Sequence, residues 1–204
     1  MSSGWLYRPS HLAPGTVHSF GYAGGEDAQA RLDALMENEA TFLLDIRYRP
    51  VSRFRPQWNR AALSERYGSR YAWVPSLGNQ NYQHKERAIA LAIGHGQAVR
   101  NAAQLVASGL SLVLLCACKD ERHCHRTLVI EKMDACLSDE RAWRIVFRGR
   151  SDETGIVDWT TGIIRAANGL GLDSGVVVQE VRRLLRPDRS PGQEDIRKTA
   201  RKAQ

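Results

Sequence analysis

The chain has 204 residues, of which 43% are hydrophobic and 25% are charged, and its formal net charge at pH 7 is +7. This composition excludes a disordered chain, and the absence of a long apolar run or an N-terminal apolar core excludes a membrane span and a secretory signal. We therefore expect a cytoplasmic protein with no membrane partner, whose basic balance favours nucleic acid or an anionic small molecule.

Strand and helix patterns alternate along the first three quarters of the chain. In chain order they predict an N-terminal arm at 1–15, a strand at 16–21, a helix at 27–38, a strand at 41–46, a helix at 59–67 and a strand at 71–74. The continuous apolar run Thr41–Ile46 is typical of a strand buried on both faces of a parallel sheet. Asn59 is the predicted cap of the short helix that follows it.

The second half of the chain continues the alternation and then changes in character. It predicts one broken helix or two helices at 84–108, a strand at 110–117, a helix at 122–137, a strand at 144–147 and helices at 158–168 and 174–185. Asp173 or Ser174 is expected to cap the last helix. The pattern predicts an α/β domain over residues 16–150 with a central, mostly parallel sheet flanked by helices. Residues 151–204 are expected to form a helical extension with a basic, frayed tail.

Asp45 lies at the end of the buried strand at 41–46, and Arg47 follows it. Ligands of open α/β sheets lie beyond the carboxyl ends of the strands, so both residues are candidate site residues. Asp45 and Arg47 could pair with each other or with the loop backbone. Alternatively, the forked donors of Arg47 could bind a carboxylate or a phosphate.

The segment after Arg47 mixes basic and aromatic residues. The arginines are Arg47, Arg49, Arg53, Arg55 and Arg60, and the aromatic residues among them are Tyr48, Phe54 and Trp58. Such a mixture can hold a phosphate backbone and stack bases, although many arginine-rich loops are only solvated surface.

The segment LLCACKDERHCHRTL at 114–128 contains three of the four cysteines of the chain. Its first part predicts the end of a strand at Cys116, and its second part predicts a helix that begins near Arg122–Cys124. The N-terminus of a helix carries positive potential, which favours a thiolate at neutral pH. The segment therefore has three interpretations: a metal site, a thiol active site, or a structural loop.

The metal interpretation has enough ligands but an unfavourable spacing. Residues two apart in a strand share a face but stand roughly 7 Å from each other, so Cys116 and Cys118 converge only if the strand has already ended. There is also no second C-x-x-C pair of the kind that completes a standard structural zinc site. We therefore predict no metal and no other cofactor.

The other two interpretations remain open. In a thiol active site, Cys116 would act as a nucleophile or persulfide carrier with the assistance of His125 or Arg126. In a structural loop, Cys116 and Cys124 would be small apolar residues, while His125 and Arg126 would bind loop carbonyls or an anion. Cys136, on the apolar side of the predicted helix, fits the structural role.

Four motifs occur in a fixed order along the chain. They are TVHSFGY at 16–22, DIRYRPVS at 45–52, YAWVPSLGN at 71–79 and LLCACKDERHCHR at 114–126. In this order they resemble the domain-of-unknown-function 488 (DUF488) family of small prokaryotic proteins. The resemblance spans about residues 16–137, and the succession of strand ends also resembles the topology of rhodaneses.

The resemblance implies a set of site positions but no reaction. These positions are Asp45, Arg47, Pro50, Ser52, Cys116, Cys124, His125 and Arg126. This chain has Cys118 where the family usually carries a glutamate. On this basis, catalytic roles are expected for Asp45, Cys116, Cys124, His125 and Arg126, and substrate contacts for Arg47 and Ser52. The basic and aromatic loop adds Tyr48, Arg49 and Trp58 as expected substrate contacts.

Three functions fit these features. The first is a cysteine-dependent enzyme that acts on a nucleic acid, a nucleotide or another anionic substrate. The second is a nucleic-acid-binding module without chemistry, and the third is an adaptor whose C-terminal helices contact a partner. The convergence of polar groups at one edge of the sheet favours the enzyme.

Overall fold

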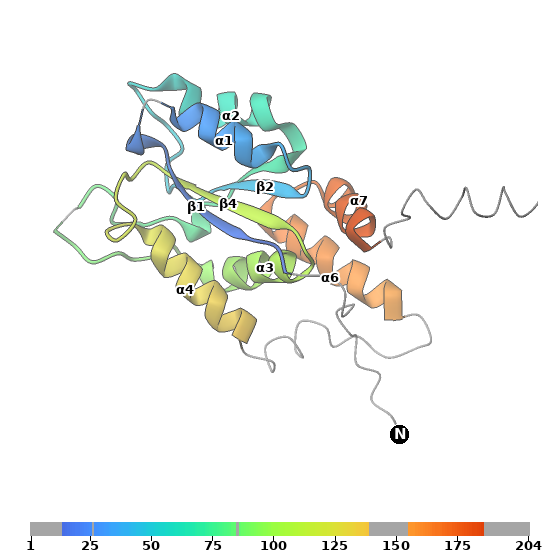
Figure 1. Cartoon of the computed structure of the whole chain (residues 1–204). Coiled ribbons are helices and arrows are strands. Elements are labelled where there is room, and N and C mark those ends of the chain that lie inside the picture. The colour runs from blue at the N-terminus through green and yellow to red at the C-terminus, as the bar shows by residue number, and fades with distance from the viewer. Residues whose placement is uncertain (1–13, 26, 85, 139–154, 186–204) are drawn as a thin grey trace, which may run out of the picture.

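A parallel four-stranded sheet forms the centre of the protein (Figure 1). The computed structural model describes residues 14–25, 27–84, 86–138 and 155–185. The strands are β1 (Val17–Gly21), β2 (Thr41–Asp45), β3 (Tyr71–Trp73) and β4 (Ser111–Cys116), in the spatial order β1-β4-β2-β3. All three ladders are parallel, which confirms the predicted α/β fold class.

Helices cover both faces of this sheet. They are α1 (Ala28–Met36), α2 (Arg60–Tyr67), α3 (His95–Ala107), α4 (His125–Ser138), α6 (Gly155–Leu170) and α7 (Ser174–Leu185). Short 3-10 helices occupy Tyr22–Gly24, Pro56–Trp58, Gly68–Arg70 and Pro75–Leu77. Figure 1 shows α1 and α2 on one side of the sheet and α3, α4 and α6 on the other. No helix of the described segments is both long enough and apolar enough to cross a bilayer.

The two faces of β2 belong to two different hydrophobic clusters. Leu43 packs with residues of α1 and α2, whereas Phe42 and Leu44 pack with residues of α3, α4, α6 and α7. Side chains alternate along a strand, so a strand buried on both faces needs an unbroken apolar run. The run Thr41–Ile46 meets this need, and its burial confirms the prediction.

The helices α6 and α7 share the core of the α/β domain. Ala166 and Leu170 of α6 and Val177 of α7 are buried in the same cluster as α3 and the sheet. Asp173 caps α7, since its Oδ1 accepts hydrogen bonds from the backbone N–H groups of Gly175 (2.8 Å) and Val176 (3.2 Å). The predicted helical C-terminal region is thus present, and it is packed against the domain.

The first part of the broken helix, or the first of the two helices, expected at 84–108 is wrong. The segment is helical only from His95, and Ala88, Ala90 and Ala92 form hydrogen bonds with an earlier loop. There the backbone N–H of Gln80 donates to the carbonyl of Ala90 (2.8 Å), and that of Ala92 donates to Gly78 (3.0 Å). These long-range bonds replace the local bonds of a helix. The strand predicted at 144–147 lies outside the described residues.

The shared core leads to a test of domain independence. Leu170 is 2% exposed, so Leu170→Ala should leave a cavity in the core and lower the free energy of unfolding by about 2–5 kcal/mol. Urea denaturation should show the loss in a single cooperative transition. The control Ile93→Ala, at a side chain that is 94% exposed, should change the stability by less than about 0.5 kcal/mol. A separate early transition in the Leu170→Ala variant would contradict the shared core.

Candidate cysteine–histidine site

The site lies where the carboxyl ends of three neighbouring strands meet. Gly21 of β1 is in register with Cys116 of β4, and Asp45 of β2 is in register with Leu115. After Cys116 the chain forms a polar loop and enters α4 at His125. This connection brings the start of α4 back to the edge that the strand has just left.

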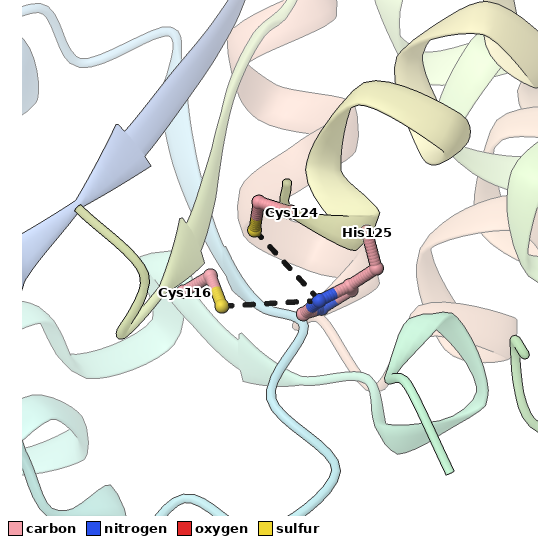
Figure 2. Close-up of side chains that lie close together, drawn as sticks. All are labelled: Cys116, Cys124 and His125. Atoms are coloured by element: carbon pink, nitrogen blue, oxygen red, sulfur yellow. Dashed lines mark hydrogen bonds between the residues drawn. The ribbon is translucent and has the colours of Figure 1, made fainter. Parts of the chain in front are cut away.

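Three ligand-type side chains converge at this edge (Figure 2). The sulfur atoms of Cys116 and Cys124 each lie 3.8 Å from Nδ1 of His125, and all three atoms are within 4.8 Å of one another. The three side chains are 6% exposed or less. We call Cys116, Cys118, Cys124 and His125 the cysteine–histidine cluster.

The contact of the other ring nitrogen, Nε2, determines the tautomer of His125. Nε2 lies 2.9 Å from the carbonyl oxygen of Ile46, just past the end of β2. A carbonyl only accepts hydrogen bonds, so Nε2 carries the proton and donates it. In the neutral ring, Nδ1 therefore presents a lone pair to the two sulfur atoms.

Arg126 is the nearest positive charge to the cluster. Its guanidinium is buried, with Nε 3.2 Å from the sulfur of Cys124 and Nη2 3.1 Å from the carbonyl oxygen of Cys118. Among the described residues, no carboxylate lies within 4 Å of this guanidinium. A buried charge needs an opposite charge, and the thiolate of Cys124 is the group in position to supply it.

The three thiols of the cluster differ in acidity. Contacts with the thiols of Cys116 and Cys118, with the ring of His125 and with the backbone N–H of Arg126 lower the pKa of Cys124, against the effect of burial. The thiol of Cys118 favours ionisation of Cys116, yet neighbouring Cys124 and burial prevail and raise the pKa of Cys116 to about 11. The contact with Cys116 raises the pKa of Cys118. Cys124 is the thiol that ionises first.

Cys118 lies beside the other thiols, although it is exposed to solvent. Its sulfur is 3.6 Å from that of Cys116. The two side chains converge because β4 ends at Cys116 and the chain turns before Cys118. The strand therefore ends early enough for Cys116 and Cys118 to converge, as their sharing of one metal ion would require.

Gly21 makes room for this arrangement. A Cβ atom at this position would overlap the carbonyl oxygen of Cys118 and would lie 2.7 Å from Nη1 of Arg126. Neither Gly21 nor the carbonyl of Ile46 was predicted as part of the site. A glycine at the end of a strand was the available signal for the first, but a backbone carbonyl leaves no signal in a sequence.

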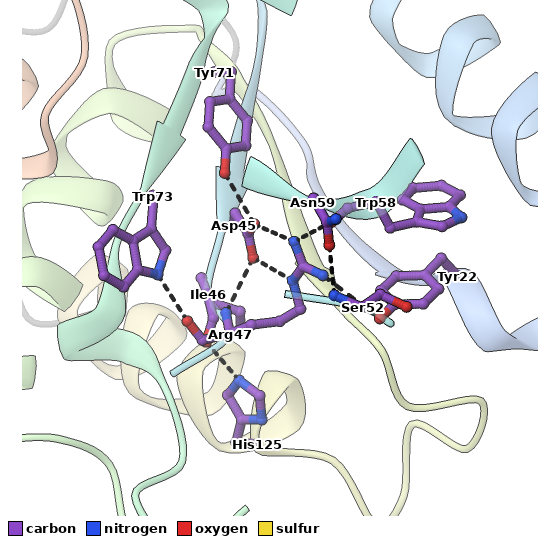
Figure 3. Close-up of polar contacts among 10 residues, drawn as sticks. All are labelled: Tyr22, Asp45, Ile46, Arg47, Ser52, Trp58, Asn59, Tyr71, Trp73 and His125. Atoms are coloured by element: carbon purple, nitrogen blue, oxygen red, sulfur yellow. Dashed lines mark hydrogen bonds and ion pairs between the residues drawn. The ribbon is translucent and has the colours of Figure 1, made fainter. Parts of the chain in front are cut away.

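Asp45 and Arg47 form a closed network beside the cluster (Figure 3). Oδ1 of Asp45 accepts from Nε of Arg47 (2.7 Å), and Oδ2 accepts from Nη2 (2.5 Å) and from the hydroxyl of Tyr71 (3.0 Å). Nη2 also donates to the carbonyl of Trp58 (2.7 Å), and Nη1 lies 3.5 Å from the hydroxyl of Tyr22. Both side chains are buried, and together they connect strand ends and loops. This arrangement matches the interpretation in which Asp45 and Arg47 pair with each other and with the loop backbone.

The remaining predicted contact residues are dispersed. Trp58 is 2% exposed and stacks on Tyr22, with the ring centroids 4.7 Å apart, so its ring is part of the core. The backbone N–H of Ser52 donates to Oδ1 of Asn59 (2.5 Å) and so connects two parts of the loop. Asn59 precedes α2 as expected, but its side chain makes no capping hydrogen bond to the helix. By contrast, Tyr48 and Arg49 are exposed on the surface.

The comparisons with known proteins give a single family. A model of the family described as "Domain of unknown function DUF488" matches residues 27–133, a segment that runs from α1 into α4. No curated protein and no solved structure matches the chain. The rhodanese-like topology therefore remains a prediction.

The closed Asp45–Arg47 network should be important for stability. Arg47→Met leaves the buried carboxylate of Asp45 without its ion pair, and we expect a loss of about 3–5 kcal/mol in the free energy of unfolding. The matched control is Arg66→Met, because Arg66 pairs with Asp33 at the surface and is 52% exposed. Removal of this exposed pair should cost about 0–1 kcal/mol. Equal losses in urea denaturation would contradict the structural role of Arg47.

Proposed function

The chain belongs to the DUF488 family, whose description names no reaction, and on this premise we propose that it is a cysteine-dependent enzyme. In this proposal Cys124 is the nucleophile, Arg126 stabilises its thiolate, and the substrate is a small anionic electrophile. The observation that carries the proposal is the 3.2 Å contact between the buried guanidinium of Arg126 and the sulfur of Cys124.

Cys124 is better suited than Cys116 to the role of nucleophile. Cys124 directly precedes α4, so its thiolate benefits from the positive end of the helix as well as from Arg126. Cys116 is the last residue of β4, and its raised pKa keeps its thiol protonated at neutral pH. Cys116 therefore donates a hydrogen bond that favours the thiolate of Cys124.

The charge of Arg126 favours an anionic substrate. When the Cys124 thiolate forms a covalent bond, it loses the negative charge that balances the buried guanidinium. A substrate that carries its own negative group restores this balance, whereas a neutral substrate leaves a buried charge unpaired.

The proposed reaction has two steps. First, the thiolate of Cys124 donates an electron pair to the electrophilic atom, and the bond to the leaving group breaks with its electron pair. Then Nδ1 of His125 accepts a proton from water, and the resulting hydroxide attacks the adduct and releases the thiolate. The sulfur of Cys124 is buried, so the loop from Ala117 to His123 must move before a substrate enters.

Alkylation by an anionic and a neutral reagent tests this proposal. Iodoacetate and iodoacetamide are similar in size, so the ratio of their rates cancels the effect of loop opening. In metal-free protein, we expect the rate with iodoacetate divided by the rate with iodoacetamide to be about tenfold higher at Cys124 than at Cys136. The reason is that the positive charge of Arg126 attracts the anionic reagent. Mass spectrometry of peptides assigns each modified cysteine.

Two variants at Arg126 provide the control. Arg126→Lys keeps the positive charge and should keep part of the preference for iodoacetate, whereas Arg126→Met should abolish it. Circular dichroism confirms that each variant is folded. If Cys124 in the native chain prefers iodoacetate over iodoacetamide no more than Cys136 does, the proposed nucleophile is wrong.

The loop after β2 favours a second candidate function, the binding of single-stranded nucleic acid. Phe54 is 89% exposed, and Arg49 and Arg53 beside it are exposed as well. The ring of Tyr48, 38% exposed, lies 6.0 Å from that of Tyr82. Exposed aromatic rings among arginines can stack bases while the arginines contact phosphates.

Single-stranded DNA is the probe for this candidate. Phe54→Ala should weaken binding by about 1–3 kcal/mol through the loss of one stacked base. The control Ile93→Ala removes another exposed apolar side chain and should leave the affinity unchanged. Binding of the native chain should fall steeply with salt in a fluorescence anisotropy titration. Binding that ignores both salt and Phe54→Ala would exclude this surface.

A further inference from the structure

The four side chains of the cysteine–histidine cluster form a set of metal-ligand atoms, three sulfurs and one imidazole nitrogen. From their juxtaposition we infer that Cys116, Cys118, Cys124 and His125 form a tetrahedral site for a soft divalent cation, Zn²⁺. Thiolates and imidazole are the ligands that Zn²⁺ prefers, and the set contains no oxygen ligand of the kind that Mg²⁺ or Ca²⁺ requires.

Three distances between the ligand atoms are close to those of a tetrahedral zinc site. Bonds of about 2.3 Å to sulfur and about 2.0–2.1 Å to nitrogen place neighbouring ligand atoms of a tetrahedron about 3.5–3.8 Å apart. The sulfurs of Cys116 and Cys124 are each 3.8 Å from Nδ1 of His125. The sulfur of Cys118 is 3.6 Å from that of Cys116. Cys116, Cys124 and His125 can thus contact one ion with small adjustments. Cys118 lies outside this set of atoms mutually within 4.8 Å and joins it by a movement of its exposed loop.

The orientation of His125 is an independent observation that points to a metal. Histidine ligands of metals usually donate their other N–H group to a carbonyl or a carboxylate, which fixes the tautomer and orients the ring. Here Nε2 of His125 donates to the carbonyl of Ile46 at 2.9 Å, and Nδ1 presents its lone pair to the sulfurs.

The charge of the site also fits a divalent ion. Three thiolates and a neutral imidazole around Zn²⁺ leave one negative charge, which the buried guanidinium of Arg126 neutralises. Nε of Arg126 lies 3.2 Å from the sulfur of Cys124, and its other donor contacts the carbonyl of Cys118. Arg126 therefore contacts two of the four ligand residues, and Gly21 provides the space for these contacts.

The position of Cys118 provides an entry route for the ion. Cys116, Cys124 and His125 are buried, whereas Cys118 is exposed in the loop above them. An ion from solvent can therefore meet Cys118 first.

Metal binding at the cluster does not depend on Cys124 being a nucleophile, but it would change the reactivity of Cys124. A bound Zn²⁺ occupies the lone pair of Cys124, so the loaded protein should react slowly with alkylating reagents. Metal-free protein tests the nucleophile, and metal binding tests the cluster, so each proposal can fail while the other holds.

Cobalt substitution is the direct test. Reduced, metal-free chain titrated with Co²⁺ should bind one ion and show a thiolate-to-cobalt charge-transfer band together with the intense visible bands of tetrahedral Co²⁺. Added Zn²⁺ should displace the cobalt and bleach these bands, and native mass spectrometry should show one Zn²⁺ per chain. Weak, octahedral cobalt bands or several equally weak ions per chain would overturn the inference.

Matched cysteine variants assign the ligands. Cys118→Ser, at an exposed position, should leave the fold intact and weaken Zn²⁺ binding more than about 100-fold, since loss of an outer-shell partner alone costs 10–100-fold. The control Cys136→Ser removes a cysteine of α4 outside the cluster and should leave the affinity and the cobalt spectrum unchanged. Equal affinity in the Cys118→Ser variant would overturn the four-ligand site.

A protection experiment connects the two proposals. Zn²⁺ should slow the alkylation of Cys124 at least about tenfold, whereas Cys136 should react at the same rate with and without the ion, and a chelator should restore the reaction of Cys124. Alkylation of Cys124 at an unchanged rate under saturating Zn²⁺ would show that the ion binds elsewhere and would overturn the assignment of Cys124 as a ligand.

Discussion

Arg126 is buried at the start of α4, and a buried guanidinium is tolerated only when an opposite charge or a full set of hydrogen bonds compensates it. In the described part of the chain no carboxylate performs this role, so the thiolate of Cys124 becomes the partner. This constraint determines the chemistry of the edge. It places a positive charge against the sulfur of Cys124, next to His125.

The same edge of the sheet contains a second buried arginine with the opposite solution. Arg47 is paired with Asp45 by two hydrogen bonds and is further held by the carbonyl of Trp58. Its donors are used within the protein, and the pair stabilises the ends of β2 and β3. The two arginines thus differ in their partners: Arg47 binds a carboxylate and connects the loops, whereas Arg126 contacts the sulfur of Cys124.

The fold was largely predictable because its signals are local. The apolar runs at Thr41–Ile46 and Leu110–Ala117 predict buried strands, and all four described strands and α7 occur where the patterns place them. The helix expected from residue 84 fails because the segment before His95 forms hydrogen bonds with the loop around Gly78, a partner distant in sequence. The large aromatic ring of Trp58 suits both stacking on a base and burial in a core. Only its packing on Tyr22 in the structure shows that it is a core residue.

The sequence alone determined the parallel α/β architecture, the family resemblance and the segment that contains the reactive groups, because periodicity and residue type are properties of neighbouring positions. Only the tertiary structure decided how these groups are used. The end of β4 at Cys116 lets Cys118 turn back toward it, and the carbonyl of Ile46 fixes the tautomer of His125. Both depend on where a strand ends and which backbone lies beside it, and these distances in space are set by packing between elements rather than by spacing along the chain.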